Sequence, residues 1–289
     1  MTFWCYAKCS ACQKSKKWFF FSMFFMLISF LLTGCGKGEE DSGAEYMVLI
    51  GEGPEIAQKI SNVDLLVIDA QDFSGEEIAA LRDRNVEKIY SYLNIGSIET
   101  YRPGYDHFEP YALGEYENWP QEKWMDVAEK EWKDYLLEQA GLLAEKGVDG
   151  FFLDNIDVYY RFPNEDIYRG IVDILRGLRQ IGRGIILNGG DVFVSRYLQE
   201  EAEVLFDGIN QEDVYTTYDF ESGSFGVNTE KDREYFALYL DELLGRGYDV
   251  YVTEYAKDGE TADAARLFAQ QHRYECYVSD NIELRMNGA

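Results

Sequence analysis

The residues Gly150-Phe151-Phe152-Leu153-Asp154-Asn155-Ile156-Asp157-Val158-Tyr159 run from a short apolar segment directly into two acids. The apolar part is too short for a helix and does not alternate with polar residues, which predicts a β-strand buried on both faces of a parallel sheet. Carboxylates at the C-terminal end of such a strand lie at the edge where parallel-sheet proteins bind ligands. We therefore expect an active-site strand that ends at Asp154 and Asp157.

Similar apolar runs recur along the chain, with amphipathic segments between them. The predicted strands are 46–50, 65–69, 88–95, 150–154, 184–188, 205–210, 249–254 and 274–279, and the predicted helices are 74–84, 119–146, 164–181, 229–246 and 262–271. Ser74 and Glu77 have the spacing of a capping box at a helix start. Eight strand–helix repeats without a dinucleotide-binding glycine motif predict an α/β fold, a (β/α)₈ TIM barrel that forms a single domain over residues 46–289.

In such a barrel the C-terminal strand ends build the active site. Nearly every predicted strand delivers a polar side chain there: Asp69, Asp72, Glu99, Asp154, Asp157, Asn188, Asp191, Glu212, Asp213, Glu254 and Asp280. Any single acid of this set is also explained as part of a solvated loop. Their concentration directly after buried runs favours a site.

The N-terminal residues resemble a bacterial lipoprotein signal. Four lysines precede an apolar segment, which ends in Leu32-Thr33-Gly34-Cys35. We expect residues 1–34 to be a removed signal peptide, Cys35 to carry the lipid, and residues 35–45 to be a flexible tether. The alternative is a transmembrane anchor, but the apolar run is shorter than the roughly 20 residues that span a bilayer. These features predict a cell-surface protein, anchored to the bacterial membrane through lipid only.

Removal of residues 1–34 would leave 23 basic and 53 acidic residues, a net charge of −30. Such a field repels nucleic acid and attracts cations or a cationic polymer, although a soluble acidic surface explains it equally well. Cys276 would be the one cysteine left in the folded part, and its strand-like surroundings predict a buried structural thiol.

Paired carboxylates in an aromatic-lined site suit the cleavage of glycosidic bonds, because one can protonate the leaving oxygen while the other attacks the anomeric carbon or activates water. With His107 and His272 as the only histidines, a zinc site is not expected. Calcium held by Asp154, Asn155 and Asp157 stays open as an alternative. A serine nucleophile would need a Gly-x-Ser-x-Gly elbow, which is absent from the sequence. No cofactor is indicated.

Five blocks of the chain resemble glycoside hydrolase family 114. They are Leu-Leu-Val-Ile-Asp at 65–69, the segment 92–102, Trp-Pro-x-x-x-Trp-Met-Asp-Val at 119–127, the segment 147–157, and Asn-Gln-Glu at 210–212. The resemblance spans about residues 46–280 and implies a (β/α)₈ enzyme similar to endo-α-1,4-polygalactosaminidases. By position, it implies Asp154 as the nucleophile and Glu212 as the general acid and base. Repulsion from an ionised Asp154 is expected to raise the pKa of Glu212.

The same resemblance suggests further residues that hold an amino-sugar polysaccharide. Candidates for binding its hydroxyl or amino groups are Asp69, Glu99, Asp126, Asp157 and Asp213. Arg102 either contacts the sugar or forms an ion pair with Glu99 or Asp69. Candidates for stacking on its rings are Tyr92, Trp119, Tyr159 and Tyr215. Asp213 adjoins Glu212, so the sequence leaves open which of the two faces the cleft.

One departure from the family pattern affects this site. Ser97-Ile98 stands where the family pattern has Glu-Ala, so one acid of that loop is missing. The missing acid affects a sugar subsite and therefore the choice of polymer, not the enzyme class, and we expect the protein to be a monomer. The alternative is a non-catalytic polysaccharide-binding or export-associated lipoprotein with the same barrel. Retention of both Asp154 and Glu212 favours the enzyme.

Overall fold

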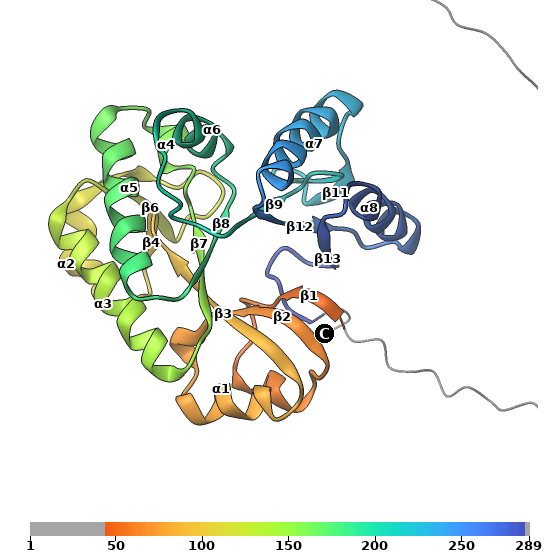
Figure 1. The fold of residues 1–289 in the computed structure, drawn as a ribbon, viewed down its shortest axis with the longest axis horizontal. Helices are drawn as coiled ribbons and strands as arrows, with labels where there is room; N and C mark the ends of the chain where they lie inside the picture. The colour runs from red at the N-terminus through yellow and green to blue at the C-terminus, as the bar shows by residue number, and fades with distance from the viewer. Residues whose placement is uncertain (1–43, 287–289) are drawn as a thin grey trace, which may run out of the picture. The chain divides into compact units, whose positions relative to one another are not determined.

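A computed structural model describes residues 44–286 of the 289-residue chain. Eight parallel strands form one sheet, in the order β1-β2-β3-β7-β8-β9-β12-β13 (Figure 1). Their bounds are β1 Ala44–Val48, β2 Val63–Ile68, β3 Val86–Asn94, β7 Gly150–Asp154, β8 Gly184–Asn188, β9 Gly208–Glu212, β12 Asp249–Tyr255 and β13 Glu275–Ser279. The two terminal strands of the sheet, β1 and β13, contact each other, so the sheet is nearly closed as a barrel. The predicted fold class is confirmed.

Helices cover the outside of the sheet (Figure 1). They are α1 Gly75–Arg82, α2 Tyr105–Phe108, α3 Lys130–Lys146, α4 Val158–Arg161, α5 Glu165–Gln180, α6 Asp191–Glu200, α7 Glu230–Gly245 and α8 Gly259–His272, with short 3₁₀ turns at Pro54–Gln58, Ala70–Asp72 and Glu109–Tyr111. The capping box at the start of α1 is present, because Ser74 and Glu77 each bond the backbone N–H of the other. Helix α6 was not predicted.

The predicted helix 119–146 is wrong in its first third. Glu122–Met125 forms strand β6, and the helix begins only at Lys130. Strand β6 lies between β4 (Ser97–Glu99) and β5 (Ala112–Glu115) in a small antiparallel sheet inserted after β3. Trp124 and Met125 are buried, Glu122 and Lys123 are partly buried, and β6 pairs with a strand on each side.

A second insertion follows β9. It is the antiparallel hairpin of β10 (Thr216–Asp219) and β11 (Ser224–Val227). Both insertions leave the barrel at the C-terminal ends of strands, so they add walls above that end without disturbing the barrel sheet.

Close packing fixes the strand positions inside the barrel. A Cβ added to Gly150 would lie 2.4 Å from ring carbons of Tyr90, and one added to Gly184 would lie 1.9 Å from the Tyr90 hydroxyl oxygen. The Tyr90 ring thus packs directly on the backbone of β7 and β8. At the other end of β3, the buried Trp132 of α3 donates a hydrogen bond from Nε1 to Ile95 O at 2.9 Å. These contacts hold β7, the strand that opened the sequence argument, in the middle of the sheet.

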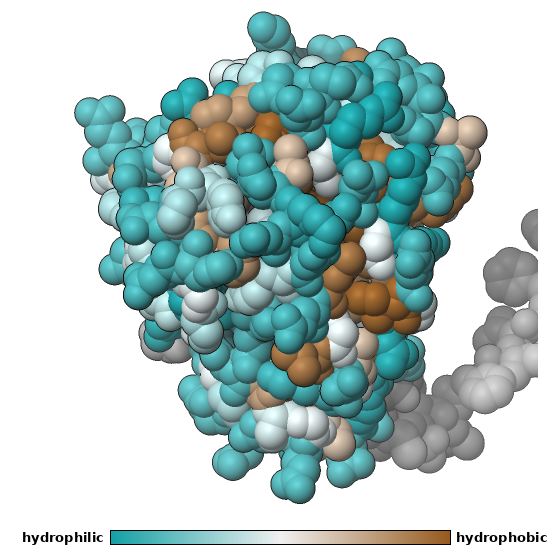
Figure 2. Space-filling view, turned by 90° about the vertical axis from the view of Figure 1, so that its left-hand side faces the viewer, coloured by the Kyte–Doolittle hydropathy of each residue, from teal (hydrophilic) through white to brown (hydrophobic). Residues whose placement is uncertain are grey.

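The face of the molecule in Figure 2 is mostly hydrophilic, with small hydrophobic patches between. Cys276, on β13, is half-buried, and burial raises the pKa of its thiol to about 12. No helix between residues 44 and 286 has the length and apolar character needed to cross a membrane. The predicted signal peptide, the predicted tether up to residue 43 and the predicted lipid site Cys35 lie outside the described residues.

Candidate active site

The C-terminal strand ends open into a cavity of about 860 Å³. Acids from four different strands of the molecule line it: Asp69 after β2, Glu99 on β4, Asp154 on β7 and Glu212 on β9. The inserted segments add aromatic walls, namely Tyr101, Tyr116, Trp119, Tyr218 and Phe220. The site therefore combines carboxylates at its floor with rings at its rim, as a sugar-binding cleft requires.

One amide joins the two acids of the predicted pair. Asn188 Nδ2 donates to Asp154 Oδ1 and to Glu212 Oε1, each at 2.8 Å. This contact is possible because β8 lies between β7 and β9, so a side chain at its end reaches both neighbours. The two carboxylate oxygens are consequently separated by no more than twice 2.8 Å.

The Asn188 amide is itself held in one orientation. Its Oδ1 accepts from Asn210 Nδ2 at 2.7 Å, and Asn210 Oδ1 accepts from the hydroxyls of Tyr46 and Thr253, both at 3.0 Å. Because the hydroxyls occupy the oxygen of Asn210, its nitrogen points to Asn188 and turns the nitrogen of Asn188 toward the acids. The chain of hydrogen bonds starts at β1 and crosses the barrel interior.

Burial raises the pKa of both acids. For Asp154 the pKa rises to about 6, first through burial and then through the charge of Glu212, while the Asn188 hydrogen bond lowers it. For Glu212 burial again is the main cause, opposed by hydrogen bonds from Tyr255 and Asn188 and assisted by Asp213. The pKa of Glu212 is raised, as expected, but the main cause is removal from water, and the charges that add to it are those of Asp213 and Asp157.

Tyr255 contacts the other oxygen of Glu212. Its hydroxyl donates to Glu212 Oε2 at 2.6 Å. Tyr255 ends β12, the strand next to β9 in the sheet, so the carboxylate of Glu212 is held from both neighbouring strands. Asn188 holds Oε1 and Tyr255 holds Oε2, which leaves Glu212 little freedom to rotate.

Asp213, the neighbour of Glu212, is turned toward the β10–β11 hairpin. Its backbone has a positive φ of 53°, and its carboxylate accepts from Tyr218 N at 3.3 Å. The hydroxyl of Thr216 lies 3.3 Å from Asp213 Oδ1 but gives its proton to Glu254 Oε2 at 2.6 Å. The buried Glu254 accepts from the N–H groups of Tyr215 and Thr216 in the same loop. Asp213 and Glu254 thus shape the loop. Of the two neighbouring acids, Glu212 is the one joined to Asp154 through Asn188.

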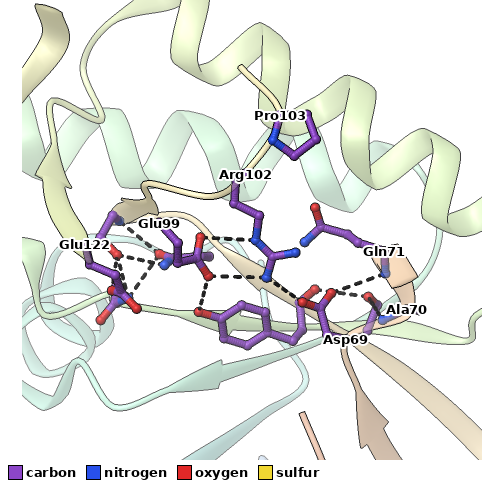
Figure 3. A network of polar contacts seen from close by, with 12 residues as sticks. Asp69, Ala70, Gln71, Glu99, Arg102, Pro103 and Glu122 are labelled. Carbon is purple, nitrogen blue, oxygen red and sulfur yellow. Dashed lines mark hydrogen bonds and ion pairs between the residues drawn. The ribbon is translucent and has the colours of Figure 1, made fainter. Parts of the chain in front are cut away.

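A buried ion-pair network also lines the cavity (Figure 3). Arg102 Nη2 pairs with Asp69 Oδ2 and, at 3.3 Å, with Glu99 Oε1, and the three side chains are at most 10% exposed. Tyr92 donates to Glu99 at 3.4 Å. The two acids raise the pKa of Arg102. Burial raises the pKa of Asp69 although Arg102 opposes the shift. Of the two roles considered for Arg102, the ion pair is the one observed.

Asp157 lines the cavity beside two glycines in the left-handed region. A Cβ on Gly189, whose φ is +67°, would lie 2.6 Å from Asp157 Oδ2, and Gly190 has a φ of +76°. Burial, followed by the charges of Asp191 and Asp154, raises the pKa of Asp157 to about 7. Since a side chain at Gly189 would fill the space of the carboxylate, the glycine makes room for this acid.

The calcium alternative finds no support in the geometry. Asn155 is buried and donates through Nδ2 to Asn94 Oδ1 at 3.0 Å and to Ser97 Oγ at 2.9 Å, away from Asp154. Across residues 44–286, no group of three His, Cys, Asp or Glu side chains is placed to hold a metal ion.

The structure brings most of the candidate binding residues to the cavity, but three lie elsewhere. Trp119 lines it, 37% exposed, with its ring edge-on to Phe220 at 5.9 Å. Asp126 lies outside it and accepts from Ala128 N at 3.0 Å just before α3. Tyr215 packs on Phe268 outside the cavity lining. Tyr159, also outside, accepts a hydrogen bond from Arg196.

The sequence reasoning missed four residues of the site. Asn188 was noted as a strand-end residue without a role, and Tyr255 directly follows Glu254, so strand position could have pointed to both. Tyr116 and Glu122 gave no such signal, because the β4–β5–β6 insertion that places them was not foreseen. Burial raises the pKa of Glu122 to about 8, although Ser97 donates to it at 2.7 Å.

Two carboxylates joined through one amide at the C-terminal end of a (β/α)₈ barrel are the equipment of a glycoside hydrolase. The chain belongs to glycoside-hydrolase family GH114, whose model matches residues 37–189. It is a glycoside hydrolase, as the sequence resemblance implied.

Solved structures share the fold. The glycoside hydrolase domain of PelA from Pseudomonas aeruginosa has a TM-score of 0.70 at 19% identity, covering 85% of this chain and 97% of that one. Ega3 from Aspergillus fumigatus, in complex with galactosamine, has 0.65 at 16%, covering 88% and 97%. The α-galactosidase TtGalA from Thermus thermophilus has 0.52 at 13%, covering 81% and 58%. No curated protein sequence matches this chain.

Proposed function

We propose that this glycoside hydrolase cleaves α-1,4-linked, galactosamine-containing exopolysaccharide by a retaining mechanism, with Asp154 as nucleophile and Glu212 as general acid and base. The observation that carries the proposal is the amide of Asn188, which donates to both acids at 2.8 Å. Retaining enzymes hold their carboxyl groups about 5–5.5 Å apart, whereas inverting enzymes need about 6.5–9.5 Å to admit water. Asp154 Oδ1 and Glu212 Oε1 lie at most twice 2.8 Å apart, which supports a retaining mechanism.

In the first step Asp154 attacks the anomeric carbon while Glu212 gives its proton to the leaving glycosidic oxygen, which yields a glycosyl ester on Asp154. In the second step Glu212 takes a proton from water, the water oxygen attacks the anomeric carbon, and Asp154 leaves as a carboxylate. The Asn188 and Tyr255 contacts keep both acids in place through the cycle. The raised pKa of Glu212 is what its role as an acid near neutral pH requires.

Two features support an amino-sugar polymer as substrate. The cavity lining holds the acids Asp69, Glu99, Glu122, Asp154, Asp157, Glu212, Asp213 and Glu283 against the bases Arg102 and Arg285. An acid excess attracts protonated amines. The volume of about 860 Å³ exceeds what one sugar ring fills, which suits a polymer bound on both sides of the cleaved bond and therefore endo action.

The test is the release of reducing ends from partly deacetylated galactosaminogalactan, compared with Asp154→Asn and Glu212→Gln. We expect each substitution to lower kcat by about 1000-fold or more. NMR of the first product should show the α-anomer. An inverted product would refute the retaining mechanism, and a wild-type protein that binds the polymer without cleaving it would show a polysaccharide-binding lipoprotein instead.

We further propose that the protein acts as a monomer on the cell surface, held by lipid on Cys35. The lysine-rich start, the apolar segment and Leu32-Thr33-Gly34-Cys35 support this location. Cys35→Ala should abolish incorporation of labelled palmitate into the protein. If the label persists in the variant, Cys35 is not the lipid site.

A further inference from the structure

Glu122 is an acid of the cavity that the proposed mechanism does not use. It lies on β6, paired with Glu99 of β4 in the antiparallel register, and it lines the same cavity as Asp154. Figure 3 shows it on the side of Glu99 that faces away from Arg102. The inserted sheet thus extends the acidic wall of the cleft beyond the ion-pair network.

The hydrogen bonds around Ser97 determine how Glu122 is held. Ser97 Oγ accepts from Asn94 Nδ2 at 2.7 Å and from Asn155 Nδ2 at 2.9 Å. Because both amides donate to this oxygen, its single proton goes to Glu122 Oε2 at 2.7 Å. Ser97 stands where the family pattern has an acid, and here its hydroxyl supports an acid supplied by the neighbouring strand.

The second oxygen of Glu122 is free to meet a ligand. Oε1 has no hydrogen-bond or ion-pair partner within residues 44–286, and it is not among the buried unsatisfied atoms of that part of the chain, so it is open to the cavity. Arg102, the base whose charge acts on Glu122, is already paired with Asp69 and Glu99, and Lys123 is paired with Glu109 and Glu115. Glu122 is therefore a carboxyl group with one hydroxyl donor and no direct cation partner.

The charges around Glu122 favour a cation in this position. The titratable groups that act on it are Glu99, Asp154 and Arg102, together with the phenols of Tyr92, Tyr101 and Tyr116. Burial is the main cause that raises the pKa of Glu122 to about 8, and the charges of Glu99 and Asp154 add to it. A cation bound beside Oε1 would offset all three effects.

We propose that Glu122 is a specificity-determining residue, which binds the protonated amine of a galactosamine unit through Oε1 and so selects de-N-acetylated sugar over N-acetylated sugar. This inference rests on the proposed function. An N-acetyl group has no positive charge, so it cannot offset the burial and the charges of Glu99 and Asp154 that act on the Glu122 carboxylate. Selection then follows from a charge-assisted hydrogen bond that only the free amine can make.

Proton release gives a readout that a structural role would not move. Below pH about 8, Glu122 holds a proton in the empty cleft. Binding of an ammonium group favours the ionised carboxylate, so the proton leaves on binding. Calorimetry at pH 7 in buffers of different ionisation enthalpy should detect release of about one proton with an α-1,4-linked galactosamine oligomer. The fully N-acetylated oligomer should release none from Glu122.

The deciding variant is Glu122→Gln, which keeps the shape and removes the charge. We expect kcat/KM for the galactosamine oligomer to fall about tenfold to a hundredfold, kcat/KM for the N-acetylated oligomer to stay within a factor of about two, and the proton release to disappear. Glu115→Gln is the matched control, because Glu115 is an exposed acid of the same small sheet outside the cavity lining. It should leave every value unchanged.

Equal losses on both oligomers, or an unchanged preference in Glu122→Gln, would overturn the assignment. If Glu122→Gln melts far below the wild type, Glu122→Asp replaces it, because its shorter side chain draws the charge away from the ligand. A Glu122→Asp variant that prefers the galactosamine oligomer as strongly as the wild type does would count against the proposal. A wild type that cleaves neither oligomer overturns the proposed substrate of the hydrolase alone, since calorimetric binding still reports on Glu122. A wild type that binds both oligomers equally overturns the inference about Glu122 alone.

Discussion

Asn188→Ala tests the link between structure and mechanism most directly. The substitution removes the single nitrogen that donates to Asp154 and Glu212 at 2.8 Å. In the wild type this hydrogen bond lowers the pKa of Asp154, which burial and Glu212 raise to about 6. A hydrogen bond to a charged group contributes about 1.5–3 kcal/mol, and one pKa unit corresponds to about 1.4 kcal/mol. The pKa of Asp154 should therefore rise by about one to two units.

The assay is the pH dependence of kcat/KM for reducing-end release. The nucleophile must be ionised, so activity falls as the pH drops through the pKa of Asp154. In Asn188→Ala the acidic limb should move to higher pH by about one to two units, and kcat/KM at pH 6 should fall about fivefold to fiftyfold. The difference should shrink toward pH 9, where Asp154 is ionised in both proteins.

The matched control is Asn164→Ala. Asn164 caps α5 by accepting from Ile167 N at 3.0 Å, away from the cavity. Its loss should cost about 1 kcal/mol of stability and leave the pH profile unchanged. An acidic limb that stays in place in Asn188→Ala, or that moves to lower pH, would refute the reasoning that this amide favours the ionised form of Asp154.

Three further predictions follow from the same geometry. Tyr255→Phe removes a donor that lowers the pKa of Glu212, so the basic limb of kcat/KM should move to higher pH and kcat should fall about tenfold; a basic limb at lower pH would contradict this. Arg102→Met leaves two buried acids unpaired and should cost about 3–5 kcal/mol in the free energy of unfolding measured in urea; a cost below about 1 kcal/mol would show that the acids are neutral in the folded state. Burial raises the pKa of Glu122 to about 8 and of Asp157 to about 7, so the folded state binds more protons than the unfolded chain between pH 5 and 8. Their contribution to stability is present near pH 4, decreases above that by at most about 1.4 kcal/mol per pH unit and group, and is lost once the pH has risen through 7–8. Urea melts between pH 5 and 8 should therefore show a free energy of unfolding that falls with pH. A free energy that rises with pH would contradict the raised pKa values.

Much of the fold could be predicted because the necessary signals are local. The fold prediction used patterns of neighbouring residues: eight apolar runs, their lengths, and the glycine and capping residues between them. These patterns were sufficient to predict the eight-stranded barrel that the structure shows. Sequence also placed Asp154 and Glu212 correctly at strand ends, since side chains at the C-terminal ends of parallel strands meet at one rim.

The helix expected over 119–146 shows where local patterns stop. The pairing of β6 with β4 depends on contacts between segments more than twenty residues apart, which no short pattern encodes. That error concealed Glu122 inside a supposed helix. Asp126 became a candidate through the family block at 119–127, and in the structure its carboxylate accepts a hydrogen bond from the backbone N–H of Ala128 before α3.

The sequence by itself determined the class of this protein: a barrel whose strands end in acids, with Asp154 and Glu212 as the two to consider together. Only the tertiary structure decided which groups touch. The order β7-β8-β9 brings Asn188 between the two acids, and the turn at Asp213 sends that carboxylate toward the hairpin and leaves Glu212 in the cleft. The physical reason is that identity and spacing are properties of the chain, while hydrogen bonds, burial and the resulting pKa values depend on neighbours that the fold alone brings together.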